Sequence, residues 1–180
     1  MAEIRVTGGE LRGRRLHVPK SGVRPTTGRV REAVFSILGD VSGAMVLDLF
    51  SGSGALGIEA ISRGASEATL VDTNPRAARA NIEALGLTDR ARTVRADATR
   101  FLKRAERESF DLVLCDPPYR LADRLANELD PLIRAVLAEG GRVLVETSPA
   151  SPLPLSLPLL AERRYGDTLI RVHSGAEDRG

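Results

Sequence analysis

The chain has 180 residues, 42% of them hydrophobic, which is enough for one domain with a buried core and excludes disorder over its whole length. Aromatic residues make up only 3%, so we expect a core built from Val, Leu, Ile and Ala. The net charge of +2 is unevenly spread: residues 1–31 hold eight basic and two acidic residues, and the rest of the chain holds 18 basic and 22 acidic residues. A basic end predicts contact with a polyanion, although a merely solvated terminus would have the same composition.

The sequence contains one cysteine, Cys115, which excludes an internal disulfide and a cysteine-based metal site. Its two histidines, His17 and His173, are far apart, so no bound metal ion is predicted. We find neither an apolar leader nor an apolar run of the length that spans a membrane. We therefore expect a cytoplasmic protein that binds no membrane.

Residues 1–40 are predicted to form a basic extension with its own short elements. The stretch "IRVTGGELRGRRLHVP" (4–19) has glycine pairs and alternating apolar positions, which predict a short β-hairpin. A helix is predicted over 26–40, with Arg29 and Arg31 turned toward solvent or a ligand. The apolar face of this helix is expected to consist of Val30, Val34, Ile37 and Leu38.

Residues 41–180 alternate short apolar runs with helical patterns. Strands are predicted at 45–50, 67–72, 91–97, 111–116 and 141–148. Helices are predicted at 55–64, 74–86 and about 121–138, the second with Asn74 as N-cap and Pro75 at its first position. Val/Leu-rich strands separated by helices predict a Rossmann-like, doubly wound α/β domain with a mostly parallel sheet. After an irregular proline-rich connection (148–160), "YGDT" predicts the turn of a closing antiparallel hairpin.

A glycine-rich loop follows the first strand of this domain, in "VLDLFSGSGALGIEA". Gly52, Ser53 and Gly54 join a strand to a helix, which is typical of a loop that lets a nucleotide approach the backbone closely. With Gly57 the spacing would also fit a dinucleotide. Asp48 argues against that ligand, because an acid inside the strand would repel an anionic pyrophosphate.

Three further acids, Asp72, Asp97 and Asp116, end the following strands. The carboxyl ends of parallel strands form one crevice, where four carboxylates suit a ligand with an amino group, a sulfonium and ribose hydroxyls. We therefore predict S-adenosylmethionine as cofactor. Asp72 is placed for the ribose, Asp97 with Ala98 for the adenine, and Asp48 either to orient the loop or to contact the methionine part. A turn or N-cap role is the alternative for each acid.

The stretch "LVLCDPPY" (112–119) predicts the reaction. An exocyclic amine is a poor nucleophile because its lone pair is delocalised into the base, so an enzyme must hold it by its N–H groups. Asp116 can accept one, and carbonyls beside Pro117 and Pro118 can accept another, since proline has no competing N–H. Tyr119 offers a flat face for a base drawn from its stack. A plain turn at the strand end is the alternative.

These motifs resemble a known family. "DLFSGSGALGIEAISRGA" with "CDPPY" looks like the amino-methylating class of Rossmann-like methyltransferases. "TGGELRGRRLHVP" followed by "RPTTGRVREAVFSIL" resembles, more narrowly, the bacterial 16S ribosomal RNA guanine-N2 methyltransferases that modify guanine 966. The resemblance implies that the D-P-P-Y motif is catalytic and that the substrate is 16S ribosomal RNA. We also expect a monomer, and a small-subunit assembly intermediate as its target, because an arm on one side could contact RNA and bound protein together. The resemblance also implies RNA contacts from the basic arm, at Arg12, Arg14, Arg15, Arg24, Thr26, Arg29 and Arg31.

Two other functions remain open at this point. The D-P-P-Y motif alone also permits methylation of adenine N6 in DNA or RNA. A non-catalytic RNA-binding module could retain the same fold, but such a protein would have little need for Asp116.

Overall fold

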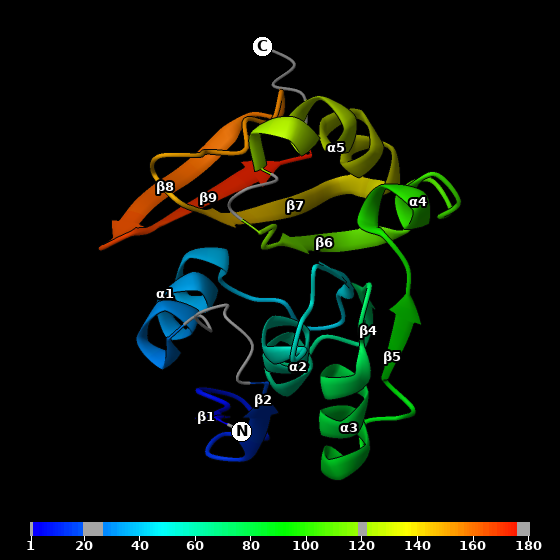
Figure 1. The fold of residues 1–180 in the computed structure, drawn as a ribbon, viewed down its shortest axis with the longest axis vertical. Helices are drawn as coiled ribbons and strands as arrows, with labels where there is room; N and C mark the ends of the chain where they lie inside the picture. Colours follow the sequence, from blue (N-terminus) through cyan, green and yellow to red (C-terminus); the bar gives the residue numbers. More distant parts are fainter. Residues whose placement is uncertain (1, 20–26, 119–121, 176–180) are drawn as a thin grey trace.

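A computed structural model describes residues 2–19, 27–118 and 122–175, with side chains left out for residues 2 and 122–126 (Figure 1). The chain begins with the predicted β-hairpin, formed by β1 (Ala2–Arg5) and β2 (Arg15–Val18) in antiparallel register. Helix α1 (Gly28–Leu38) follows, and the Thr27 side chain caps it by accepting the N–H of Val30.

A seven-stranded sheet forms the centre of the molecule, in the order β5-β4-β3-β6-β7-β9-β8. The strands from β3 to β7 run parallel, whereas β9 is antiparallel to both β7 and β8. Their bounds are β3 Met45–Leu49, β4 Glu67–Asp72, β5 Ala91–Arg95, β6 Phe110–Cys115, β7 Leu137–Thr147, β8 Leu159–Tyr165 and β9 Thr168–Ser174. The predicted doubly wound sheet and its closing hairpin are both confirmed.

Helices cover both faces of the sheet (Figure 1). Helices α1, α2 (Ala55–Ser62) and α3 (Arg76–Leu85) lie on one face with the β1–β2 hairpin, and α4 (Ala98–Leu102) and α5 (Ala122–Val136) lie on the other. Each face has its own aliphatic core, as the composition predicts. Among the described residues, no helix combines the length and apolar character needed to cross a membrane.

One helix start and one additional helix differ from the prediction. Helix α3 begins at Arg76 with Pro75, not Asn74, in the N-cap position and no side-chain cap. The Asn74 backbone N–H donates to Asp72 Oδ1, 2.8 Å away. The short helix α4 was not predicted, because five residues are too few to show a helical period in the sequence.

The N-terminal extension shares a core with the sheet. Val6, Leu16, Val34 and Phe35 are buried against residues of α2, β4 and α3. Asn81 of α3 adds polar contacts, because its Oδ1 accepts the His17 N–H at 2.9 Å and its Nδ2 donates to the His17 carbonyl at 3.0 Å. The extension is therefore fastened to the face that carries the glycine loop, and its role as a separate RNA-binding unit stays a prediction.

Candidate functional site

The strand order reverses between β3 and β6. From β3 the chain builds outward through β4 and β5, then crosses back so that β6 pairs with the other side of β3. In open α/β sheets, ligands bind outside the carboxyl ends of the strands at such a point. Asp48 lies in β3 and Asp116 directly follows β6, so both predicted site residues lie at this reversal.

The loop between β3 and α2 requires its glycines. Gly54 has φ 79°, and a Cβ there would lie 2.7 Å from Leu70 Cδ2. A Cβ on Gly57 would lie 3.0 Å from Asp48 Oδ2, which is tighter than normal packing. Phe50, at the exit of β3, also has a left-handed φ of 61°, which is uncommon for a residue other than glycine. The chain thus turns sharply at the strand end and keeps the loop close to the sheet.

Asp48 is buried under this loop. Its Oδ2 accepts the backbone N–H of Gly57 at 2.9 Å, which ties the first turn of α2 to β3. Burial raises the pKa of Asp48 to about 7, with a further contribution from the negative charge of Asp72 and an opposing one from the Gly57 hydrogen bond. Of the two roles considered for Asp48, this geometry favours orienting the loop.

Asp72 joins the end of β4 to the glycine loop. Its Oδ2 accepts the N–H of Gly52 at 2.8 Å, and its Oδ1 accepts the N–H of Asn74 at the same distance. Each carboxylate oxygen has a second lone pair, so these bonds leave room for hydroxyl donors of a ligand. A ribose contact at Asp72 remains a prediction, with the carboxylate held in a fixed orientation.

Asp97 is the N-cap of α4. Its Oδ1 accepts the Thr99 hydroxyl at 2.6 Å, the Thr99 N–H at 3.0 Å and the Arg100 N–H at 3.3 Å. The Thr99 hydroxyl contributes most to lowering the pKa of Asp97. The capping role considered as an alternative is therefore present, and an adenine contact at Asp97 or at the buried Ala98 stays a prediction.

Asp116 lies among other acids at the end of β6. Burial raises its pKa well above the usual range, and the carboxylates of Glu146 and Asp48 raise it further. Pro117 is buried and Pro118 is exposed, whereas Tyr119 lies outside the described residues. The preceding Cys115 is fully buried, and its thiol pKa is raised, as expected of a core residue.

Glu146 was missed in the sequence. It is buried in β7, the strand beside β6, and it acts electrostatically on both Asp116 and Arg31. The sequence does indicate this residue, because "VLVETS" places an acid near the end of the fifth predicted strand, as at the ends of the earlier strands.

The predicted RNA-binding residues divide into three groups: exposed residues, residues outside the described part of the chain, and the buried Arg31. Arg12, Arg14, Arg15 and Arg29 are exposed, and Arg15 also lies 3.4 Å from the Glu3 carboxylate. Arg24 and Thr26 lie outside the described residues.

The expectation that Arg31 faces solvent is wrong. Its side chain is 1% exposed, its Nη2 donates to the Arg5 carbonyl at 2.5 Å, and its Nε lies 3.9 Å from Glu59 Oε2. The buried face of α1 is wider than the apolar residues indicate, because position 31 is three and four residues before Val34 and Phe35 and so shares their face. Arg31 is accordingly removed from the RNA-binding set.

Comparison with known proteins decides the family. A family model described as "Conserved hypothetical protein 95" matches residues 4–174. "Ribosomal RNA small subunit methyltransferase D" of Escherichia coli strain K12 is 40% identical over 158 residues, covering 84% of this chain and 78% of that protein. "Putative rRNA methyltransferase YlbH" of Bacillus subtilis strain 168 is 36% identical, covering 94% of this chain and 98% of that protein.

The chain belongs to this methyltransferase family. The family predicted from the D-P-P-Y and N-terminal motifs is therefore confirmed. A solved structure titled "Putative methyltransferase yhhF from Escherichia coli" superposes with a TM-score of 0.81 at 36% identity, covering 96% of this chain and 98% of that one. A solved structure titled "Crystal structure of SMU.776, a putative methyltransferase complexed with SAH" shares only the fold, at 20% identity and a TM-score of 0.62 over 81% of this chain and 48% of that one.

The glycine loop between β3 and α2 contains a buried hydroxyl group without a hydrogen-bond partner among the described residues. This hydroxyl belongs to Ser51. A buried hydroxyl normally has a partner, so Ser51 is suited to a polar ligand group. Sequence reasoning chose the neighbouring Ser53, whose carbonyl accepts a hydrogen bond from Asn81 at 2.9 Å. With the glycine loop and Asp72, this site fits S-adenosylmethionine.

Proposed function

We propose that the protein transfers a methyl group from S-adenosylmethionine to the exocyclic N2 amine of a guanine, family position 966, in 16S ribosomal RNA. The observation that carries this proposal is the Asp116-Pro117-Pro118 segment at the reversal of strand order, beside a fixed glycine loop. The chain's 40% identity to a protein named as a small-subunit ribosomal RNA methyltransferase supports the substrate class.

The residues of the loop hold the cofactor in this proposal. Asp72 accepts the ribose hydroxyls, Asp97 and Ala98 lie by the adenine, and Ser51 to Gly54 surround the methionine part. Gly52 is fixed for this purpose by its 2.8 Å hydrogen bond to Asp72. S-adenosylmethionine supplies an electrophilic methyl group on a positively charged sulfur.

Asp116 and the carbonyls beside the two prolines hold the guanine amine. By accepting its N–H groups they aim the nitrogen lone pair along the line of transfer. The nitrogen gains positive charge as the new bond forms, so its hydrogen bonds to Asp116 and to the carbonyls become stronger. That positive charge would also favour ionisation of Asp116, which its burial and its acidic neighbours otherwise oppose. Fixed acceptors that stabilise a developing charge are a large part of enzymatic rate enhancement. The methyl–sulfur bond would break to leave S-adenosylhomocysteine, and the nitrogen would give its extra proton to water, which leaves the neutral methylated amine. Tyr119 would support the base.

We further propose that the substrate is an assembly intermediate of the small subunit and that the protein acts as a monomer in the cytoplasm. The exposed Arg12, Arg14, Arg15 and Arg29 support the contact with RNA, because they present positive charge on an extension that is hydrogen-bonded to α3. Arg24 and Thr26 belong to the same segment of sequence.

Product analysis tests the proposal. The protein is incubated with labelled S-adenosylmethionine and either 16S RNA or small subunits from a strain lacking the modification, and the RNA is digested to nucleosides. Label in N2-methylguanosine is the expected result, whereas label in N6-methyladenosine would assign the enzyme to adenine. RNA binding without any label would indicate a binding module. Comparing free RNA with assembled subunits determines which one is the substrate.

A further inference from the structure

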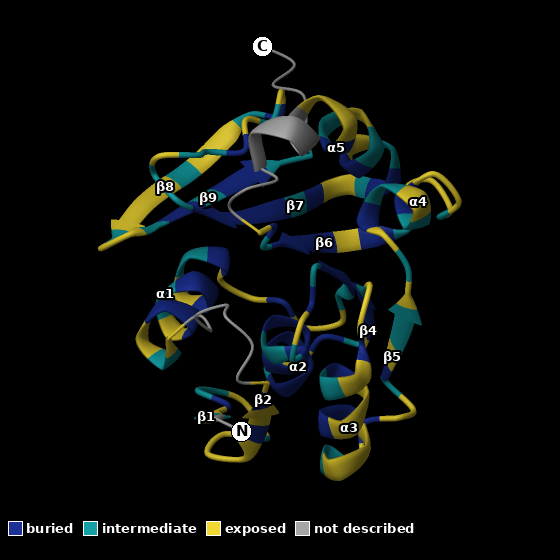
Figure 2. Cartoon of the chain, in the orientation of Figure 1, coloured by how far each residue is buried: buried dark blue, intermediate teal, exposed yellow. Residues whose placement is uncertain are grey.

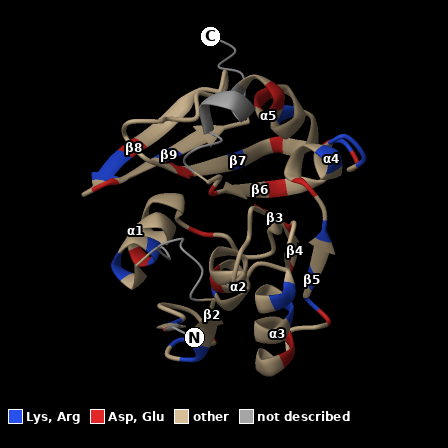
Figure 3. Ribbon diagram, in the orientation of Figure 1, with Lys and Arg blue, Asp and Glu red and all other residues tan. Residues whose placement is uncertain are grey.

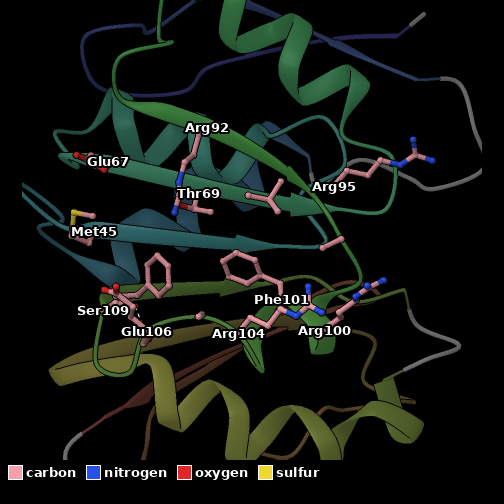
Figure 4. A pocket seen from close by; sticks show the side chains of 14 residues that line it. Met45, Glu67, Thr69, Arg92, Arg95, Arg100, Phe101, Arg104, Glu106 and Ser109 are labelled. Carbon is pink, nitrogen blue, oxygen red and sulfur yellow. Dashed lines mark hydrogen bonds between the residues drawn. The ribbon is translucent and has the colours of Figure 1, made fainter.

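A groove of about 700 Å³ lies on the face of the sheet that carries α4, outside the site described above. It is lined by residues of β4 and β5, of α4 and of the segment that leads into β6 (Figure 4). None of Asp48, Asp72, Asp97 and Asp116 lines it.

The groove exists because this face is incompletely covered. Helix α5 packs on β7, but the helix beside β4 and β5 is α4, which has only five residues. Figure 2 accordingly shows intermediate and exposed residues along β5, whereas β7 near the centre of the sheet is mostly buried. Thr69, Val94 and Phe110 line the groove from the strands, and the half-buried ring of Phe101 lines it from α4.

Positive charge gathers around this groove. Four arginines line it, and all four are exposed: Arg92, Arg95, Arg100 and Arg104. Residues 92–107 hold six basic and two acidic residues, within the part of the chain that is otherwise net negative. Figure 3 shows this second basic cluster on β5, α4 and the loop after α4, away from the N-terminal hairpin.

Basic and acidic residues lie at opposite ends of the groove. Arg95 ends β5 and Arg100 lies in α4, which Asp97 caps, so both are near the carboxyl edge of the sheet. In Figure 4 they lie at one end of the groove, and Glu67 and Glu106 lie at the other. The positive end is therefore the end next to the proposed adenine position.

We propose that this groove binds a segment of the substrate RNA strand near the target base, with phosphates on Arg95, Arg100 and Arg104 and a base on Phe101. Guanidinium groups bind phosphate through paired hydrogen bonds, and an aromatic ring beside them offers a stacking surface for any base. This combination fits RNA better than an acidic peptide, because every nucleotide carries a flat base beside its phosphate, whereas Asp and Glu side chains carry no ring to stack.

This proposal rests on the proposed function, because it places the target base in the crevice between two basic surfaces. The N-terminal hairpin lies on the α2 and α3 face of the sheet, and the groove lies on the α4 face. An RNA strand that enters the crevice at the carboxyl edge would thus be held on both faces.

The test compares two double variants within residues 100–107, each of which replaces two basic residues with Glu. Arg100→Glu with Arg104→Glu changes two groove residues. Lys103→Glu with Arg107→Glu makes the same change of charge at exposed positions that do not line the groove. Binding to unmodified 16S RNA is measured for each at several salt concentrations. Cofactor binding and thermal unfolding are measured in parallel.

We expect the groove variant to bind RNA about tenfold or more weaker, since a hydrogen bond to a charged group contributes roughly that factor. Its salt slope should fall by about 1.4, which corresponds to two lost contacts with single-stranded RNA. The control variant should change much less, and cofactor binding and unfolding should match the unaltered protein.

Other outcomes would contradict the proposal that this groove binds RNA. An equal loss of RNA affinity in both double variants would indicate non-specific attraction by the positive charge of this segment and no binding site in the groove. Unchanged binding of free RNA, with weaker methylation of assembled subunits, would indicate an acidic protein as the occupant. If the unaltered protein binds RNA but methylates none, the proposed function fails, while the binding comparison still decides the role of the groove.

Discussion

Arg31 and Glu59 form a buried ion pair, with Arg31 Nε 3.9 Å from Glu59 Oε2 and both side chains at most 1% exposed. Glu59 also accepts the Thr7 hydroxyl at 2.6 Å and the Gly8 N–H at 2.8 Å, and Arg63 lies 3.0 Å from it. One carboxylate in α2 therefore joins the turn after β1, helix α1 and the end of α2. The orientation of the N-terminal extension depends on this contact.

Replacing Glu59 with Ala should lower the free energy of unfolding by about 3–5 kcal/mol, because the buried Arg31 would lose its counter-charge. Hydrogen exchange of Thr7 and Gly8 should increase at the same time. Urea denaturation measures the first effect, and Glu83→Ala at an exposed position of α3 is the control. A loss below about 1 kcal/mol would show that the hairpin is held by its apolar contacts instead.

Arg29 and Arg31 should behave oppositely when each is replaced with Glu. Arg29 is exposed, so its reversal should weaken RNA binding and lower the salt slope by about 1 without changing stability. Arg31→Glu would place a second buried carboxylate beside Glu59 and should unfold the protein at lower urea concentrations. Binding assays and denaturation of both variants check this. Normal RNA binding by the Arg29→Glu variant would show that Arg29 does not contact the RNA.

The strands and the closing hairpin could be predicted because their signals are local. The Val/Leu runs, the glycine loop and "YGDT" each identify an element from a few adjacent residues. The burial of Arg31 could not be predicted, because it depends on Glu59, which is 28 positions away and on another helix. The same holds for Asp72, whose contact with Gly52 forms only when β3 and β4 pair.

Two parts of the site had signals that were not used. The acid series continues to Glu146, so the end of the fifth strand could have been included. The sequence "DAT" places an N-cap residue before Thr99, which is a typical helix start, but the helix is too short for its period to show. The second basic cluster was not predicted, because the charge was summed over residues 32–180, where the total is negative. That sum does not show the local excess of basic residues over 92–107.

Asp48 should make the protein less stable as the pH rises. Its folded pKa of about 7 lies above the ordinary aspartate pKa of 3.8, so between these values the folded state binds more protons than the unfolded state. Stability is then lost with increasing pH up to about pH 7, with a loss of about 3 kcal/mol between pH 5 and pH 8 from this group. Asp48→Asn should remove that part of the pH dependence. Denaturation curves at several pH values measure it, and an unchanged slope in the variant would contradict the assignment.

Asp116 should be essential for methyl transfer but not for cofactor binding. Asp116→Ala removes an acceptor that holds the amine, so kcat should fall by at least about 10²–10³ while the affinity for S-adenosylmethionine stays within about twofold. Unfolding at neutral pH should not become easier, because the half-buried carboxylate lies near the charges of Glu146 and Asp48, an arrangement that disfavours its own charge.

Three measurements separate this role of Asp116 from a structural one. Asp116→Asn keeps one acceptor oxygen and should retain more activity than Asp116→Ala. Asp89→Ala, at an exposed turn before β5, removes a carboxylate at the opposite edge of the sheet from the carboxyl strand ends and should leave transfer unchanged. Calorimetric titration with the cofactor completes the set, since a large loss of cofactor affinity in Asp116→Ala would place Asp116 in cofactor binding instead of amine positioning.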